Sequence, residues 1–286
     1  MTPRELLRLA ARRLREAGIP DPDVDGALLL SHLTGRPPLE LRLDGMHPLA
    51  EDILAGFHSL LAQRLRRVPL QYLTGEASFL GQVFHVDSRV LIPRPETELL
   101  AERAIAALRR YPAPASALDL CCGSGCLGVS LALAVPAALV ELTDLSPDAL
   151  AVAEANARRL GARAAFHQGD LFAPVAARRF HVIVSNPPYI PTAACANLQA
   201  EVRQEPAMAL DGGADGLAFY RRIASEALAH LHPGGTLLLE VGWDQGEAVR
   251  RLLAEAGFRP TAVYPDMQNI PRMVEGRAPE VKEHGR

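Results

Sequence analysis

The second half of the chain alternates apolar segments with amphipathic segments, and this alternation restricts the fold more than any other feature of the sequence. Apolar runs alternating with amphipathic helices predict a parallel sheet that is covered on both faces. The expected strands are 116–120, 138–144, 163–170, 180–186 and 235–242, with a last β segment over 259–277. The expected helices are 95–110, 126–134, 146–160, 217–231 and 244–257. The fold class is therefore α/β.

Two further regions precede this pattern. Residues 1–67 predict a helical domain, because apolar side chains recur at spacings of three to four over 4–17, 26–33 and 49–65. Residues 68–94 contain β-branched and aromatic residues punctuated by glycines, which predicts a β-hairpin linker. The third domain then covers residues 95–286.

Composition and charge exclude several classes of protein. The net charge of −3 argues against duplex nucleic acid as the main partner. The four cysteines form no C-x-x-C pair, so no metal site is expected. No apolar run approaches the roughly 18 residues of a membrane span, and the N-terminus does not resemble a signal peptide. A cytoplasmic protein with free thiols is expected.

Three expected strand ends carry residues suited to a nucleoside. The turn after 116–120 consists of Cys121, Cys122, Gly123, Ser124 and Gly125, whose backbone amides would meet a ligand at a helix N-terminus.

The next two strand ends are acidic. Asp144 is placed to accept both ribose hydroxyls, because Ser146 already occupies the helix-capping position. Asp170 would accept from an adenine amino group, with Leu171 and Phe172 lining the ring. For the glycine turn and for Asp170, an ordinary turn remains an equally valid interpretation.

The glycine turn also indicates which kind of cofactor to expect. A dinucleotide site requires G-x-G-x-x-G, whereas this turn reads C-C-G-S-G-C-L-G and lacks the first glycine. A cofactor without phosphates is therefore favoured. S-adenosyl-L-methionine meets this condition, and its carboxylate suits the amides of the turn.

The fourth expected strand ends in the motif Asn186-Pro187-Pro188-Tyr189. Proline fixes the backbone and removes donors that would otherwise satisfy nearby acceptors. The side-chain oxygen of Asn186 and the carbonyl oxygen of Asn186 or Pro187 can then accept both hydrogens of a planar –NH₂ group. Tyr189 offers a face for stacking. We interpret this corner as the catalytic site, which would orient the nitrogen lone pair toward an electrophile; a purely structural turn is the alternative.

With these motifs together, the chain resembles the release-factor glutamine methyltransferases (the HemK/PrmC family). The resemblance covers residues 1–277 and includes "RRVPLQYLTGEASFLGQVFHVDSRVLIPRPETELL", "SNPPYIP", "EVRQEPAMALDGGADGLAFYRRI" and "DMQNIPRMVEGR". It implies a Rossmann-like class I methyltransferase domain, with a mostly parallel sheet and an antiparallel final strand, behind a small helical domain that recognises the substrate.

The resemblance also implies an activity. The methyl group of S-adenosyl-L-methionine would pass to N5 of the glutamine in the Gly-Gly-Gln loop of class-1 peptide chain release factors. Asn186 to Tyr189 would bind the glutamine amide, and residues 121–125, Asp144, Phe172 and Asn186 would contact the cofactor. Arg94 and Thr97 would border the same cleft. Cys121 departs from the family pattern, which has glycine at this position.

Three other functions remain open at this point. An adenine-N6 methyltransferase acting on DNA or RNA could use the same Asn-Pro-Pro-Tyr corner, but it would need to hold phosphates and extrude a base. A non-catalytic protein that binds release factors could retain the fold. A nicotinamide oxidoreductase is disfavoured by the missing dinucleotide turn.

Overall fold

The computed structural model describes residues 1–280, which form two compact units. The first unit consists of Met1–Glu76 together with Gln199–Gln204. The second consists of Ala77–Leu198 and of the chain from Glu205 onward. Each unit has its own hydrophobic core and is described separately.

The first unit is helical. Its helices are α1 (Pro3–Glu16), α2 (Pro22–Thr34), α3 (Pro38–Leu43), α4 (Glu51–Leu65) and α5 (Leu70–Thr74). Helix α1 begins at a capping box, in which the Thr2 side chain accepts from the Glu5 amide and the Glu5 carboxylate accepts from the Thr2 amide. Helix α3 lies between the helical stretches expected from the sequence and begins at Pro38, since proline at the first helical position already has the φ angle of a helix.

An ion-pair network joins the short segment Gln199–Gln204 to the helices of the first unit. Arg64 of α4 is 5% exposed and donates to Asp25 of α2 at 2.7 Å and to Glu201 at 2.9 Å. Arg67 donates to the same Glu201 oxygen at 3.0 Å. Two arginines and two carboxylates therefore compensate one another's charge in a largely buried position.

The expected hairpin is present but shorter than its sequence region. Strands β1 (Glu76–Phe79) and β2 (Gln82–His85) form a two-stranded sheet. Helix α5 occupies the start of the region that was interpreted as linker. Val90 and Ile92 are buried but lie outside any strand, so their hydrophobicity reflects packing rather than sheet pairing.

The second unit is built on a seven-stranded sheet with the order β5-β4-β3-β6-β7-β9-β8. The strands are β3 (Ser116–Leu120), β4 (Leu139–Asp144), β5 (Ala165–Gln168), β6 (Phe180–Ser185), β7 (Leu231–Glu240), β8 (Thr261–Pro265) and β9 (Pro271–Arg277). The pairings from β5 to β7 are parallel, and β9 pairs antiparallel with both β7 and β8. The predicted fold class, with its antiparallel final strand, is confirmed.

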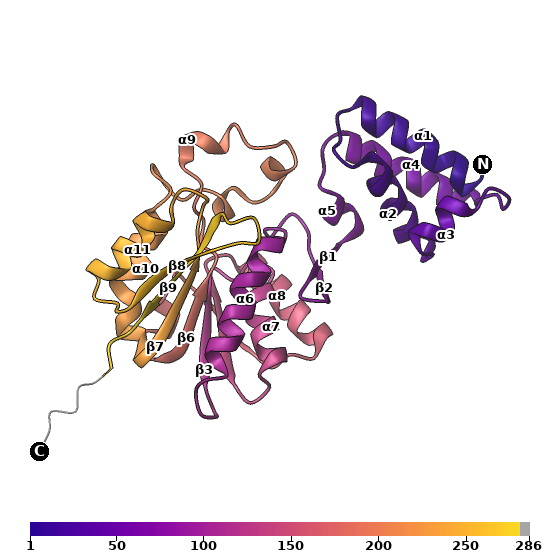
Figure 1. Cartoon of the computed structure of the whole chain (residues 1–286). Helices are drawn as coiled ribbons and strands as arrows, with labels where there is room; N and C mark the ends of the chain where they lie inside the picture. The colour runs from indigo at the N-terminus through magenta and orange to yellow at the C-terminus, as the bar shows by residue number, and fades with distance from the viewer. Residues whose placement is uncertain (281–286) are drawn as a thin grey trace, which may run out of the picture. The chain divides into compact units, whose positions relative to one another are not determined.

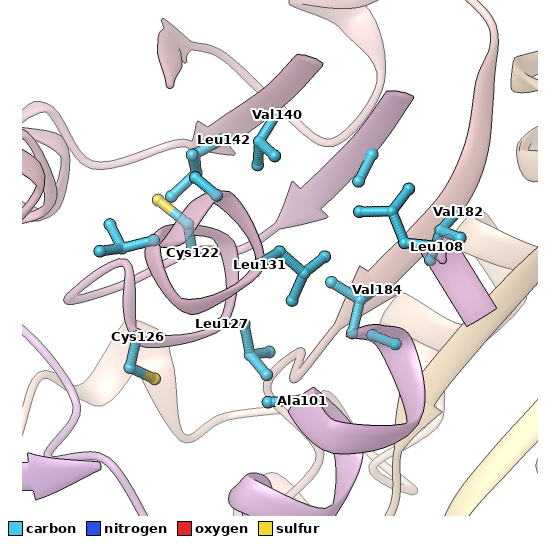
Figure 2. Packing of buried hydrophobic residues seen from close by; sticks show 14 of the residues in the cluster. Ala101, Leu108, Cys122, Cys126, Leu127, Leu131, Val140, Leu142, Val182 and Val184 are labelled. Atoms are coloured by element: carbon cyan, nitrogen blue, oxygen red, sulfur yellow. The ribbon is translucent and has the colours of Figure 1, made fainter. Parts of the chain in front are cut away.

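Helices cover both faces of this sheet (Figure 1). One side carries α6 (Pro95–Leu108), α7 (Cys126–Ala134) and α8 (Pro147–Leu160), and the other carries α10 (Ala218–Glu226) and α11 (Gly246–Glu255). Alternate residues of each strand enter the two cores. Val182 and Val184 of β6 join the core under α6 and α7, whereas Ile183 joins the core on the other side. Figure 2 shows side chains of α6, α7, β4 and β6 meeting in the first core.

Short segments complete the two units. They are α9 (Thr192–Cys195) and the 3₁₀ turns Ala173–Val175, Val202–Gln204, Ala207–Ala209 and Ala227–His230, of which Val202–Gln204 belongs to the first unit. Over residues 1–280, no helix is both long and apolar enough to span a lipid bilayer.

Candidate functional site

A cavity of about 350 Å³ opens at the carboxyl ends of the parallel strands in the second unit. The strand order reverses between β3 and β6, and a crevice at such a reversal is where open α/β sheets bind ligands. Several separate stretches of chain line the cavity, and they include all three strand ends singled out above. The lining residues predicted from the sequence are Arg94, Thr97, Cys121, Cys122, Gly123, Ser124, Asp144, Asp170, Leu171, Asn186 and Pro188.

The glycine turn connects β3 to α7 by a left-handed backbone. Cys121 has φ 58°, Gly123 has φ 53° and Gly125 has φ 79°. Glycine adopts such angles without a steric cost, whereas Cys121 carries a side chain at the position where the family pattern has glycine. A Cβ added at Gly123 would meet no atom within 4 Å, so a ligand can approach the backbone closely there.

Two glycines in this region have packing roles instead. Gly125 is the N-cap of α7 and does not line the cavity; a Cβ there would lie 3.0 Å from the Ala153 Cβ. A Cβ at Gly128 would lie 2.5 Å from the Leu142 Cγ, so glycine is what allows α7 to approach β4. The sequence does carry a signal for this close approach, because Gly128 lies inside the expected helix 126–134 and a glycine inside a helix usually has a packing role.

Asp144 organises the turn from the end of β4. One carboxylate oxygen accepts from the Gly123 amide and the other from the Ser146 amide, both at 2.9 Å. Ser146 in turn caps α8 by accepting from the Ala149 amide, as expected. Burial raises the Asp144 pKa, while these backbone hydrogen bonds lower it. Each oxygen retains a lone pair, so the carboxylate can still accept from a ligand hydroxyl.

The residues that follow β5 agree only in part with the predicted adenine contacts. Asp170 lines the cavity, but one of its oxygens accepts from Arg222 at 2.7 Å. Leu171 lines the cavity with a left-handed backbone of φ 47°. Phe172 does not line it: the ring is 1% exposed and stacks on His230, with ring centroids 4.6 Å apart. The turn at Leu171 directs the following side chain into the core.

The Asn-Pro-Pro-Tyr corner follows β6 directly. Asn186 is half-buried and lines the cavity together with Pro188, while Pro187 and Tyr189 do not. The Tyr189 ring packs against the core under α10 and α11, so the predicted stacking face does not point into the cavity in this conformation. Burial raises the pKa of the Tyr189 phenol, which therefore stays neutral.

The segment Asp211–Gly216 supports this corner from behind. A Cβ at Gly212 would lie 2.6 Å from the Tyr189 Cα, and one at Gly216 would lie 2.3 Å from the Tyr189 carbonyl oxygen. The Gln245 side chain donates to the same carbonyl at 2.9 Å. The positions of Gly212 and Gly216 therefore show close backbone packing against the corner.

Helix α6 brings further polar groups to the cavity. Arg94 lines it and is paired with Glu205, a 5% exposed carboxylate that also accepts from the Ile92 amide at 3.0 Å. Thr97 is 2% exposed and donates to Glu240, the last residue of β7, at 2.6 Å. The Asn186 amide nitrogen lies 3.4 Å from the Thr97 hydroxyl. Sequence reasoning missed Glu205 and Glu240, because their partners are more than 100 residues away in the chain.

Burial holds the thiols of the glycine turn and of the start of α7 in their neutral form. Cys121, Cys122 and Cys126 line the cavity, and burial raises the pKa of each thiol well above its usual range. Cys122 and Cys126 also belong to the core cluster, so they contribute to packing as well (Figure 2). Residues 1–280 contain no group of three or more potential ligands that could hold a metal ion.

Comparison with known families assigns the two parts of the chain separately. The family described as the PrmC N-terminal domain matches residues 5–75. The family described as the methyltransferase small domain matches residues 97–256. Among solved structures, the Thermus thermophilus 16S rRNA N2 G1207 methyltransferase, in complex with AdoMet and guanosine, superposes with a TM-score of 0.53 at 21% identity. That superposition covers 71% of this chain and 49% of the other, and it supports the methyltransferase fold alone.

Curated relatives match over nearly the whole chain. The release factor glutamine methyltransferase of Geobacter sulfurreducens is 43% identical over 277 residues, which is 96% of both chains. The Cereibacter sphaeroides protein of the same name is 44% identical over 278 residues, covering 96% of this chain and 98% of the other. Identity at this level over almost the full length establishes the family. This chain therefore belongs to the release factor glutamine methyltransferases.

Proposed function

We propose that this protein transfers the methyl group of S-adenosyl-L-methionine to the N5 side-chain amide of the glutamine in the Gly-Gly-Gln loop of class-1 peptide chain release factors. One observation carries the proposal: Asn186 and Pro188 of the proline corner line the same cavity as Gly123 and Asp144. An acceptor for a planar –NH₂ group thus lies beside a nucleoside-type site, as methyl transfer between the two requires.

The residues at the glycine turn fit the proposed cofactor. The open backbone at Gly123 and the N-terminus of α7 suit a carboxylate, and Asp144 retains acceptor capacity for ribose hydroxyls. Leu171 supplies an apolar wall, and Asp170 has one oxygen free of Arg222. When bound, S-adenosyl-L-methionine supplies an electrophilic methyl group on a sulfonium.

The corner would prepare the substrate nitrogen. An amide nitrogen is a poor nucleophile because its lone pair is delocalised into the carbonyl group. The Asn186 side-chain oxygen and the carbonyl oxygen of Asn186 or Pro187 would each accept one N–H, holding the nitrogen rigidly with its lone pair directed at the methyl group. The two prolines keep these acceptors in place, since they fix φ and contribute no N–H of their own.

Orientation and electrostatics, rather than a titrating base, would drive the reaction. Among residues 1–280, those that line the cavity include no histidine or lysine. The Tyr189 phenol and the three thiols of the turn are held neutral by burial. Fixed acceptors in a partly desolvated site would orient the nitrogen for methyl transfer, and the proton that the methylated nitrogen loses would pass to water.

The N-terminal domain, residues 1–67, would recognise the release factor. It exposes several large apolar side chains, called here the apolar patch: Val24 and Leu28 of α2, Leu39 and Leu43 of α3, and Met46. Arg42 of α3 donates to the Asp23 carbonyl of α2, and Arg4 of α1 donates to the Leu43 carbonyl of α3, so hydrogen bonds join the three helices. Exposed apolar clusters of this sort mark protein interaction sites. Residues 68–94 would serve as the linker and 95–286 as the catalytic domain.

Mass spectrometry of a release factor tests the activity. After incubation with this protein and S-adenosyl-L-methionine, the Gly-Gly-Gln peptide should gain about 14 Da on its glutamine, the mass of an added CH₂. Asn186→Ala should abolish the gain while it preserves cofactor binding. A release factor with alanine in place of that glutamine serves as the substrate control.

The same assay separates the rival functions. Transfer of labelled methyl to DNA or RNA rather than to the release factor would indicate an adenine-N6 methyltransferase. Tight cofactor binding with no transfer to any Gly-Gly-Gln protein would indicate a non-catalytic binding protein. Either result contradicts the proposal.

A further inference from the structure

The side chain of Asn186 is connected to the buried Glu240 carboxylate through the Thr97 hydroxyl group, and it also interacts with that carboxylate directly. Its amide nitrogen lies 3.4 Å from the Thr97 Oγ1, and that hydroxyl donates to the Glu240 Oε2 at 2.6 Å. Thr97 is 2% exposed and Glu240 is 3% exposed, whereas Asn186 borders the cavity. These three residues form a hydrogen-bonded chain, called here the relay, that leads from Asn186 at the cavity through Thr97 to Glu240 in the core.

The relay determines which end of the Asn186 amide faces the cavity. A hydroxyl group has one proton to donate, and an ionised carboxylate can only accept. While Glu240 is ionised it takes the Thr97 proton, so Thr97 can only accept from Asn186. Asn186 must then turn its NH₂ group toward Thr97, which leaves its oxygen to face the substrate.

We propose that Thr97 and Glu240 are positioning residues that hold the Asn186 amide with its oxygen toward the substrate –NH₂ group, and that the ionised form of Glu240 does so. This inference rests on the proposed function, because it assigns Asn186 the task of accepting an N–H from the glutamine amide. It also gives Thr97, which the resemblance places only at the border of the cleft, a role on the substrate side of the cavity.

Protonation of Glu240 removes this constraint. A protonated carboxyl group can donate to Thr97, which frees the Thr97 proton to point at Asn186. The amide then turns its oxygen toward Thr97 and its NH₂ group toward the substrate, where two sets of N–H donors oppose one another. The binding geometry is therefore lost as pH falls through the Glu240 pKa.

The surroundings of Glu240 place this transition near neutral pH. Burial, together with the charge of Glu96 on α6, raises its pKa to about 7, while Thr97, Arg272 on β9 and Asn186 lower it. The other titratable groups that interact with it are Cys126, Tyr189 and Tyr220; all three stay neutral at this pH because burial raises their pKa. Tyr220 contacts the Glu240 backbone, donating to its carbonyl at 2.8 Å.

Steady-state kinetics between pH 6 and 9, with intact release factor as substrate, tests the inference. For the wild type, kcat/KM should rise with pH through about 7 and then level off. Glu240→Gln should remove that inflection. It should also lower kcat/KM at pH 8 by about tenfold, because the loss of one hydrogen bond changes the activation free energy by about the corresponding amount. Thr97→Val should lower it by a similar factor, and Thr97→Ser should retain wild-type activity within about twofold because it keeps the hydroxyl group.

Cofactor affinity, measured by calorimetry, distinguishes positioning from general damage to the fold. It should stay within about threefold of wild type in Glu240→Gln and Thr97→Ser, which are close to isosteric. An unchanged pH profile in Glu240→Gln, or full activity in Thr97→Val, overturns the positioning role. A wild-type protein that methylates no release factor overturns the proposed function instead, so the two failures are distinguishable.

Discussion

Asp119 is an acid held inside the protein near the end of β3. It is fully buried, and one oxygen accepts from the Gly128 amide at 2.8 Å while the other has no hydrogen-bond partner within residues 1–280. Burial, with a smaller contribution from the charge of Asp144, raises its pKa to about 8. Asp119 is therefore protonated at neutral pH, and its acceptor role at α7 does not require a charge.

This shift predicts how stability depends on pH. Between about pH 4 and 8 the native state holds a proton on Asp119 that the unfolded chain has released, so the free energy of unfolding falls as pH rises. The slope is on the order of 1 kcal/mol per pH unit for one such group. Asp119→Asn keeps the acceptor for Gly128 and should reduce this fall. Urea unfolding of the wild type and of Asp119→Asn at pH 5, 6.5 and 8 measures how the free energy of unfolding changes with pH. The same pH dependence in both proteins would contradict the raised pKa of Asp119.

At the scale of elements, the proline corner depends on the segment Asp211–Gly216 that packs behind it. Gly216→Ala would place a methyl group against the Tyr189 carbonyl and the Gln245 side chain, where a Cβ would lie 2.3 and 2.6 Å away. The corner must shift to relieve this clash. We expect a loss of at least tenfold in kcat/KM for release factor methylation, together with a lower melting temperature.

Gly161→Ala is the matched control. Gly161 has φ 74° against 73° for Gly216, but a Cβ there would meet no atom within 4 Å. Both substitutions carry the same left-handed backbone cost of about 1 kcal/mol. The difference between them therefore isolates contact with the corner. If the two variants lose activity equally, backbone strain rather than support of the corner explains the effect.

Regular elements of the second unit were predictable because their determinants are local. Helix α7 follows from a continuous apolar stretch between a glycine turn and Pro136, and Ser146 caps α8 as its place before Pro147 indicates. The direction of Phe172 was not predictable, since it depends on the left-handed turn at Leu171 and on the distant partner His230. The same reason applies to Glu240, whose partner Thr97 lies on another element.

For the whole molecule, the division into two units includes one short segment that no local sequence pattern assigns to the N-terminal unit. Residues 199–204 belong to the N-terminal unit although they follow the proline corner in sequence. Glu201 joins that unit through Arg64 and Arg67, which lie more than 130 residues earlier in the chain. Charge alone could not identify this pairing, because many arginines and carboxylates in the sequence were equally available.

The apolar patch of the N-terminal unit leads to a prediction about substrate selection. Leu39 and Leu43 are 68% and 65% exposed, so replacing both with aspartate should scarcely change stability. If the release factor covers them, KM for the intact protein should rise at least tenfold, because burying one leucine contributes about 1.5–3 kcal/mol. Methylation of a short Gly-Gly-Gln peptide should be unaffected, since the peptide needs only the cavity.

Leu139→Asp provides the matched control, because Leu139 is 60% exposed and begins β4, at the opposite end of the strand from the cavity. This variant should methylate both substrates as the wild type does. Equal loss on peptide and intact protein in the Leu39/Leu43 variant would place its effect in the catalytic domain. Wild-type kinetics on intact release factor would show that the partner docks elsewhere, and that these leucines are simply exposed.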